Sequence, residues 1–298
     1  MTAISVSAQD LATATETFNN GAMELQMGNM EAALTNFQSA LEMAEALGEQ
    51  GAEIATNCKG AIPQVMFSIA KGLIKDENYE GALAQLDATI AAANKYESAD
   101  VAAEAAEFIP QVYMQQGNTA LKAKDMATAV AAYTKVIELE PANGNAMLRL
   151  GQVYAATGKV DEAVAAFEQA AANGQEKTAN KQLSTLFLKK AQAAVKAKKF
   201  QEAVDFAAKS NSYVESANAY RMAASAYQQL NNTAECIASY EKYLELNPNA
   251  KDATGVKYTI AALAQTAGNK EKAKEYYQMI LTDPQYGATA KQMLEQLK

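Results

Sequence analysis

Residues 143–170 of the chain read NGNAMLRLGQVYAATGKVDEAVAAFEQA, and this stretch decides the fold prediction. Small and large apolar residues recur in it at helical spacing: Leu150, Gly151, Tyr154, Ala163, Phe167 and Ala170. This spacing, interrupted around Gly158, predicts two amphipathic helices joined by a turn. Such a hairpin cannot bury its apolar face alone, so it has to stack on similar neighbours.

The same phase recurs along almost the whole chain. Hairpin units are predicted to start near residues 14, 63, 110, 144, 184, 217 and 254, and residues 286–298 fit a C-terminal capping helix. The pattern resembles the tetratricopeptide repeat, a helix–turn–helix unit of about 34 residues. The resemblance implies an all-α, right-handed superhelical solenoid of about seven repeats that fills residues 9–298 as a single domain and carries a concave groove.

We number each repeat so that the glycine of its first helix (helix A) is position 8, the alanine of its second helix (helix B) is position 20, and the closing proline is position 32. Small residues are expected at positions 8, 20 and 27 because the helix axes approach closely there. Large residues at position 24 are expected to fill the space between units. Cys236 falls in an alanine position, which favours a structural role over a reactive one.

Two units at the N-terminal end are longer than the rest. The extra residues, 42–62 and 91–109, are rich in alanine and glutamate, so we predict lengthened helices rather than linkers. The tetrapeptide Ile-Pro-Gln-Val occurs twice, at 62–65 and 109–112. We expect all five prolines at helix starts or repeat ends, with Pro63 and Pro110 near a helix start or at a kink.

Composition excludes several classes of function. A net charge of −8 and a pI near 4.9 argue against nucleic acid as the partner, and no apolar run is long enough for a membrane span. The chain has no histidine, so the commonest metal ligand and general base are missing, and we predict no cofactor. An enzyme is therefore the least favoured class. Cys58 and Cys236 lie in different repeats, so no disulfide is expected.

Residues 1–8 resemble the end of a secretory signal peptide, because Val6 and Ala8 have the spacing of a cleavage site that precedes Gln9. This reading places the protein in the periplasm or outside a bacterial cell. The alternative is an ordinary disordered N-terminus on a cytoplasmic protein. Met23, Met27, Met30 and Met43 also cluster in the first repeat. We interpret them as core-filling residues, with an adaptable methionine-rich binding surface as the alternative.

The resemblance also implies that helix A lines the groove through positions 2, 5, 9, 12 and 13. Among the fourteen residues at positions 9 and 13 there is no acid, and four are lysines. We therefore predict a groove that is lined by amides and is locally positive, with an ordinary solvated face as the alternative. The candidate peptide-binding residues are Lys71, Lys75, Asn118, Lys122, Gln152, Gln192, Lys196 and Arg221.

The candidates are similar in part to the carboxylate-clamp domains of this family, which hold the C-terminal carboxylate of a peptide. Asn118 and Lys122 occupy suitable positions, but Met114 and Lys71 depart from the clamp pattern. The function predicted is a non-enzymatic scaffold that binds a peptide segment of a partner protein, mainly near repeats two to four. Acidic or C-terminal carboxylate groups would suit the lysines. A homo-oligomerisation module is the alternative.

Overall fold

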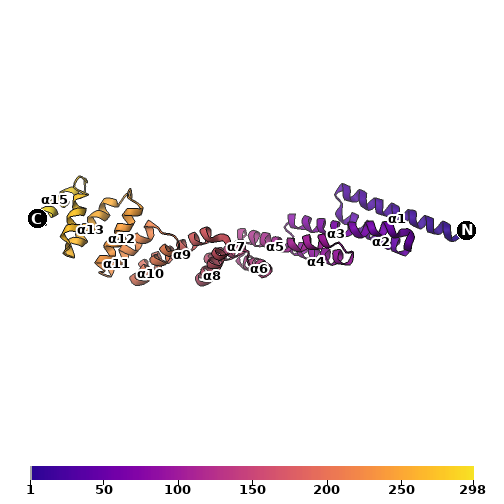
Figure 1. Ribbon diagram of the computed structural model, residues 1–298, viewed down its shortest axis with the longest axis horizontal. Helices are drawn as coiled ribbons and strands as arrows, with labels where there is room; N and C mark the ends of the chain where they lie inside the picture. The colour runs from indigo at the N-terminus through magenta and orange to yellow at the C-terminus, as the bar shows by residue number, and fades with distance from the viewer. Residues whose placement is uncertain (1) are drawn as a thin grey trace. The chain divides into compact units, whose positions relative to one another are not determined.

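The structure is a computed structural model that describes residues 2–298, with side chains from residue 8 onward. The predicted signal-peptide remnant lies almost wholly outside the described side chains and stays a prediction. The helices are α1 (Thr2–Met27), α2 (Met30–Ala46), α3 (Ala52–Lys75), α4 (Tyr79–Lys95), α5 (Ala99–Lys122), α6 (Met126–Leu139), α7 (Gly144–Ala156), α8 (Val160–Ala170), α9 (Glu176–Lys196), α10 (Phe200–Tyr213), α11 (Ala217–Gln229), α12 (Thr233–Leu246), α13 (Ala253–Thr266), α14 (Lys270–Gln278) and α15 (Gly287–Gln296) (Figure 1).

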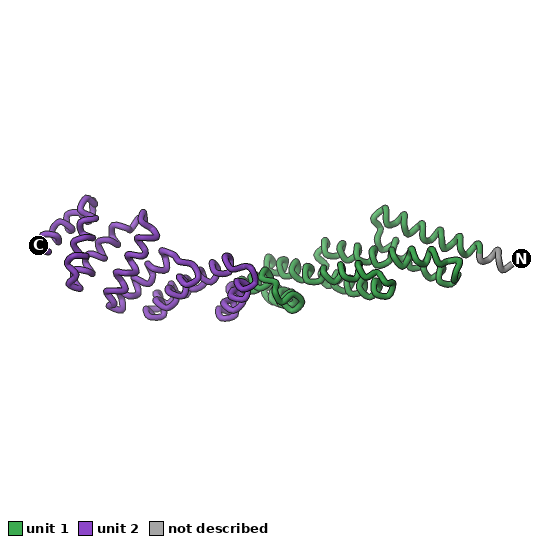
Figure 2. Tube along the Cα trace, viewed as in Figure 1, with its two compact units in different colours: residues 1–153 green, residues 154–298 purple. Residues whose placement is uncertain are grey.

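These helices form two compact units, residues 1–153 and 154–298, whose boundary falls within α7 (Figure 2). In the first unit each of the helices α1 to α5 packs against the next, and α3 also contacts α1 and α5. In the second unit α9 to α12 pack consecutively, α9 also contacts α11, and α13 packs on α14. The predicted all-α stack of helix–turn–helix units is confirmed.

All seven A-to-B turns share one backbone conformation. The residue at position 15 of every repeat is left-handed, with φ between 54° and 84°: Gly28, Glu77, Lys124, Gly158, Lys198, Asn231 and Gly268. The next residue then donates its N–H to a carbonyl five residues back, as Lys159 does to Tyr154 at 2.9 Å. This bond satisfies a carbonyl that the end of helix A would otherwise leave unpaired. The same turn therefore ends every helix A.

The small residues lie where the helices come closest, as predicted. The residue at position 20 has no exposed surface in any repeat: Ala33, Ala82, Ala129, Ala163, Ala203, Cys236 and Ala273. At position 8, a Cβ added to Gly117 would lie 2.7 Å from the ring of Tyr133, which is the residue at position 24 of the same repeat. Helices A and B of one repeat are therefore held at a separation that a single methyl group would disturb.

The lengthened helices are confirmed, but the expectation that Pro63 and Pro110 stand near a helix start is wrong. Both lie well inside helices, because α3 and α5 begin eleven residues earlier and reach 24 residues, against 13 for α7. The alanine-rich segment before each proline favours helix strongly enough to continue through it. Each proline removes one backbone hydrogen bond without ending the helix. Helix α9, at 21 residues, is also long, which the sequence had not indicated.

The connections from helix B to the next helix A differ from one another. A left-handed residue, Gly48, Glu97 or Gly174, precedes each of the long helices α3, α5 and α9. More extended residues precede the shorter A helices, such as Val214 (φ −146°, ψ 117°) before α11. The conformation of the B-to-A connection therefore correlates with the length of the helix that follows it.

The capping-helix prediction is confirmed, since Leu297 is buried and Met293 packs against the core of the last repeat. The core-filling interpretation of the methionines in the first repeat is only partly correct. Met30 packs against the core, but Met23 (51% exposed), Met27 (58%) and Met43 (38%) face solvent. Among the described residues, no helix combines the length and apolar character that crossing a membrane requires.

Candidate functional site

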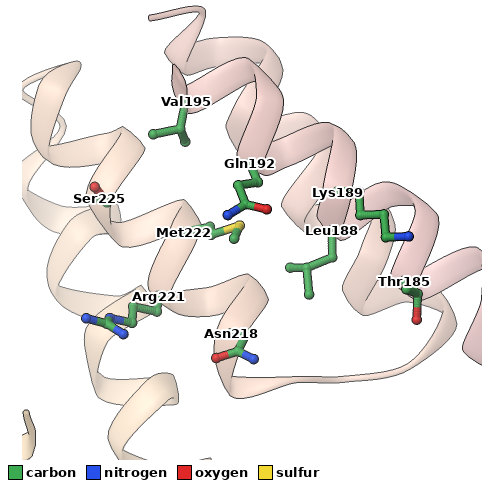
Figure 3. Close-up of a pocket in the computed structure, with 9 residues that line it drawn as sticks. All are labelled: Thr185, Leu188, Lys189, Gln192, Val195, Asn218, Arg221, Met222 and Ser225. Carbon is green, nitrogen blue, oxygen red and sulfur yellow. The ribbon is translucent and has the colours of Figure 1, made fainter. Parts of the chain in front are cut away.

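A groove of about 510 Å³ lies between the A helices of the fifth and sixth repeats, α9 and α11 (Figure 3). Its walls combine three apolar side chains with amides, hydroxyls and cations, and no carboxylate lines it. The lining residues are Thr185, Leu188, Lys189, Gln192 and Val195 from α9, and Asn218, Arg221, Met222 and Ser225 from α11. A surface of this kind suits a peptide, because apolar side chains can anchor it while amides bond its backbone.

The spacing of residues along α9 separates its groove face from its core face. Phe187, Ala191 and Ala194 are buried on the side that faces the neighbouring helices. Leu188, Gln192 and Val195, one position further on, share the other side because residues three and four apart lie on one helix face. The sequence of α9 therefore supplies the core and the groove in the same helical turns.

The side chains divide into a central group and a flanking group (Figure 3). Leu188, Gln192 and Met222 point into the space between α9 and α11, whereas the charged ends of Lys189 and Arg221 point away on opposite sides. The centre of the groove is therefore apolar with an amide, and the cations lie at its edges.

Arg221 is held by groups from the next two helices. Its Nη2 lies 2.8 Å from Oδ2 of Asp252, and its guanidinium lies over the ring of Tyr243 at 5.8 Å. The hydroxyl of Tyr243 donates to the same Asp252 carboxylate. Arg221, the predicted cation at position 5, lines the groove. However, an acid at the start of α13 pairs with its charge, so Arg221 adds less positive charge than the sequence suggested.

The candidates in the first unit lie on α3, α5 and α7. Lys71 on α3 and Asn118 on α5 already have intramolecular partners. The Nζ of Lys71 lies 4.1 Å from the centre of the Phe67 ring, and Oδ1 of Asn118 accepts a hydrogen bond from the Tyr133 hydroxyl at 2.9 Å. Lys75 and Lys122 are exposed, each one helical turn further along its helix.

Gln152 on α7 also has a partner, because its Oε1 accepts from Arg149 at 3.3 Å. A smaller hollow of about 250 Å³ lies beside α5. It contains none of the predicted candidates, and Glu140 contributes a carboxylate to its lining. The structure therefore gathers the first-unit candidates into no common pocket among the described residues.

In the second unit, Gln192 and Arg221 line the groove, and the exposed Lys196 lies one turn beyond Gln192 on the same face. The other lining residues were not among the candidates. Thr185, Leu188, Val195 and Asn218 occupy positions 2, 5, 12 and 2, so the family pattern of groove positions could have found them. Lys189 and Met222 occupy position 6, which that pattern omits.

Two further groups bear on chemistry. Burial raises the pKa of the Cys58 and Cys236 thiols to about 11, so both stay protonated near neutral pH. No group of three or more His, Cys, Asp or Glu side chains within the described residues could hold a metal ion.

Tetratricopeptide-repeat family models match two segments of the chain, residues 114–177 and residues 217–250. The chain therefore contains tetratricopeptide repeats, and its fold is an all-α stack of such hairpins. Proteins with this repeat are generally non-catalytic scaffolds. The second match covers α11 and α12, hence one wall of the groove, whereas most of α9 lies in the less typical fifth repeat. No curated protein sequence matches the chain.

Solved structures with similar folds include "Crystal structure of MamA protein", 20% identical over 61% of this chain and 96% of that one, with a TM-score of 0.37. "Crystal structure of YrrB: a TPR protein with an unusual peptide-binding site" is 21% identical over 61% of this chain and 91% of that one, with a TM-score of 0.33. The TPR2AB domain of yeast Sti1 in complex with pHSP90 is 16% identical over 96% of this chain and 97% of that one, with a TM-score of 0.37.

Proposed function

We propose that the chain is a non-enzymatic scaffold that binds a peptide segment of another protein in the groove between α9 and α11. The observation that carries this proposal is the lining of that groove, which places Leu188, Val195 and Met222 beside Gln192 and Asn218. Only helix A residues contribute to it. The proposal therefore moves the main binding region from repeats two to four to repeats five and six.

The chemistry of the groove favours an apolar anchor residue in the bound segment. Leu188, Val195 and Met222 are only partly covered by their own neighbours, so a ligand side chain that covers them removes apolar surface from water. The amides of Gln192 and Asn218 can donate to and accept from the ligand backbone. Met222 is also flexible enough to adapt to anchors of different shape.

A peptide selection tests the proposal. Random twelve-residue peptides are displayed on phage and selected on the purified chain, and the affinity of the best peptide is measured by fluorescence anisotropy. Met222→Glu should weaken that peptide at least about tenfold, because it places a charge at the apolar anchor site. Met279→Glu is the matched control, since Met279 is an exposed methionine of the same unit outside the groove. Circular dichroism checks that both variants keep their helicity.

Two results would count against groove binding. Either no peptide is enriched over an unrelated helical protein, or Met222→Glu and Met279→Glu bind the selected peptide equally well.

Self-association is the second candidate function, and the exposed methionines of the first repeat favour it. Met23 and Met27 lie one turn apart on α1, and large apolar side chains that face solvent often mark an interaction surface. Size-exclusion chromatography with light scattering measures the mass of the particle. A dimer that Met23→Glu with Met27→Glu returns to monomer would support this function, and a monomeric wild-type chain would eliminate it.

A further inference from the structure

A basic segment runs through the groove helix of this acidic protein. Residues 177–199 contain seven lysines and neither aspartate nor glutamate, although the whole chain carries a net charge of −8. The segment comprises most of α9 and the turn that follows it. One wall of the groove therefore carries charge of the opposite sign to that of the whole chain.

Three of these lysines, Lys177, Lys181 and Lys196, lie at helical spacing from the groove residues Leu188 and Gln192. Lys189 lies at the edge of the groove, and its charged end points away from α11 (Figure 3). Lys177, Lys181, Thr185 and Lys189 follow one another at intervals of four residues, and Thr185 and Lys189 line the groove. Lys196 continues the same face one turn after Gln192. We call Lys177, Lys181, Lys189 and Lys196 the lysine row.

The lysine row is exposed, and none of its members forms an ion pair in the part of the chain that the structure describes. The other lysines of the segment lie elsewhere. Lys190 lies over the Phe206 ring at 4.6 Å, Lys199 pairs with Glu202 at 2.9 Å, and Lys198 lies in the left-handed turn. Four exposed lysines that form no ion pair within the described residues therefore lie on or beside the groove face of α9.

We propose, building on the proposed function, that the ligand is an acidic protein segment in which internal Asp or Glu side chains flank an apolar anchor. The anchor covers Leu188 and Met222, and the carboxylates meet the lysine row. At a rise of 1.5 Å per residue the row spans about 28 Å, which matches about eight residues of extended peptide. Opposite charge on the two partners also speeds their encounter and disfavours basic competitors.

Two other ligand types fit the site less well. A single C-terminal carboxylate could engage one or two lysines of the row and would leave the rest without partners. A nucleic acid would present phosphates to the lysines, but it has no apolar side chain to cover Leu188 and Met222. The acidic remainder of the chain would also repel it. A segment with internal acidic side chains around an apolar anchor can pair with the lysine row and also cover Leu188 and Met222.

The peptides selected as described above test this inference. The tightest peptide is resynthesised in three forms: unchanged, with every Asp and Glu replaced by Asn and Gln, and with an amidated C-terminus. We expect selected peptides to be rich in acids around one apolar residue. The amide-substituted form should bind about tenfold more weakly or worse, because several exposed ion pairs are lost together. The amidated form should bind like the unchanged peptide.

Variants of the protein complete the test. Lys181→Gln with Lys189→Gln should weaken the unchanged peptide about tenfold and reduce the dependence of its affinity on salt concentration. Lys251→Gln with Lys291→Gln is the matched control, because it removes the same charge from exposed lysines of the same unit outside the groove. That control should leave the affinity unchanged.

The outcomes separate this inference from the proposed function. If peptides are selected but are not acidic, or if the amide-substituted form binds equally well, the acidic ligand is wrong and the groove stands. Loss of binding on amidation would point to a terminal carboxylate and overturn the inference. Tighter binding of a twenty-nucleotide oligothymidylate would overturn it in favour of nucleic acid. If no peptide is selected at all, the proposed function itself fails.

Discussion

In the third repeat, the missing side chain of Gly117 at position 8 allows helices A and B to pack closely. A Cβ on Gly117 would lie 2.7 Å from Tyr133, whose ring has no exposed surface and whose hydroxyl is fixed to Asn118 at 2.9 Å. The ring therefore cannot swing away at low cost. Close packing at this position explains why a glycine stands inside a helix, where it is otherwise unfavourable.

We predict that Gly117→Ala lowers the free energy of unfolding by about 1–3 kcal/mol, because the methyl group overpacks the contact with Tyr133. Gly60→Ala is the control, since a Cβ there meets nothing within 4 Å. That substitution should stabilise by about 0.5–1 kcal/mol through helix propensity alone. Urea denaturation followed by circular dichroism measures both. Equal effects of the two substitutions would contradict the overpacking explanation.

The two cysteines should be chemically silent in the folded protein. Burial raises the pKa of Cys58 and Cys236 to about 11, so the reactive thiolate is scarce, and neither side chain is accessible. We expect 5,5′-dithiobis(2-nitrobenzoate) at pH 8 to label neither cysteine in the native chain and both after unfolding in urea. Rapid labelling of the native chain would show that these positions open to solvent.

At the scale of the helices, the left-handed residue at position 15 is the shared element of all seven hairpins. Three repeats place glycine there, and the others tolerate Glu77, Lys124, Lys198 or Asn231. A residue with a Cβ is strained in this conformation by about 1–2 kcal/mol, asparagine less so. The hairpins therefore differ in the strain that their turns carry.

Replacing the strained residue by glycine should stabilise the protein. We predict that Lys124→Gly raises the free energy of unfolding by about 1 kcal/mol, whereas Lys135→Gly in the middle of α6 lowers it by about 1 kcal/mol. Both substitutions remove one exposed lysine. Lys135→Gly also removes an exposed ion pair with Glu138 at 2.6 Å, so the test of the backbone effect is the positive sign of Lys124→Gly. Thermal denaturation gives the comparison. Destabilisation by both variants would show that the turn conformation costs Lys124 nothing.

The hairpins could be predicted from sequence because each depends on local spacing and on one glycine or alanine per contact. Pro63 and Pro110 could not be placed, since the helix propensity of eleven preceding residues outweighs one missing N–H. Two of the candidate residues line the groove between α9 and α11. Gln192 and Arg221 follow from repeat positions, but the pairing of Arg221 with Asp252 depends on contact with another repeat. Side-chain direction, as at Lys189, also depends on such neighbours.

At the scale of the whole molecule, the helices within each unit contact mainly their neighbours along the chain. Stability in such a stack is carried repeat by repeat. Leu86 lies in α4 with no exposed surface, in a cluster that also contains Phe67 and Val112. Damage to that cluster should therefore stay local.

We predict that Leu86→Ala, which should cost about 2–5 kcal/mol through the cavity that it leaves, increases amide hydrogen exchange in α3 to α5. Exchange in α11 to α14 should not change, and this region serves as the internal control. Hydrogen exchange with mass spectrometry resolves the two regions. A uniform increase over the chain would mean that it unfolds as a single cooperative block.

The contrast between uniform A-to-B turns and variable B-to-A connections has a consequence for how the chain can be edited. Differences in repeat length within this chain coincide with the B-to-A connections, where Gly48, Glu97 and Gly174 precede longer helices. The B-to-A connections are therefore the best sites for insertions or for exchange of repeats, because the hairpins on either side keep their own internal geometry. A segment of whole hairpins that begins and ends at B-to-A connections can therefore be exchanged as a unit. Transfer of the two hairpins α9–α12 to another stack of repeats should transfer the binding specificity of the groove.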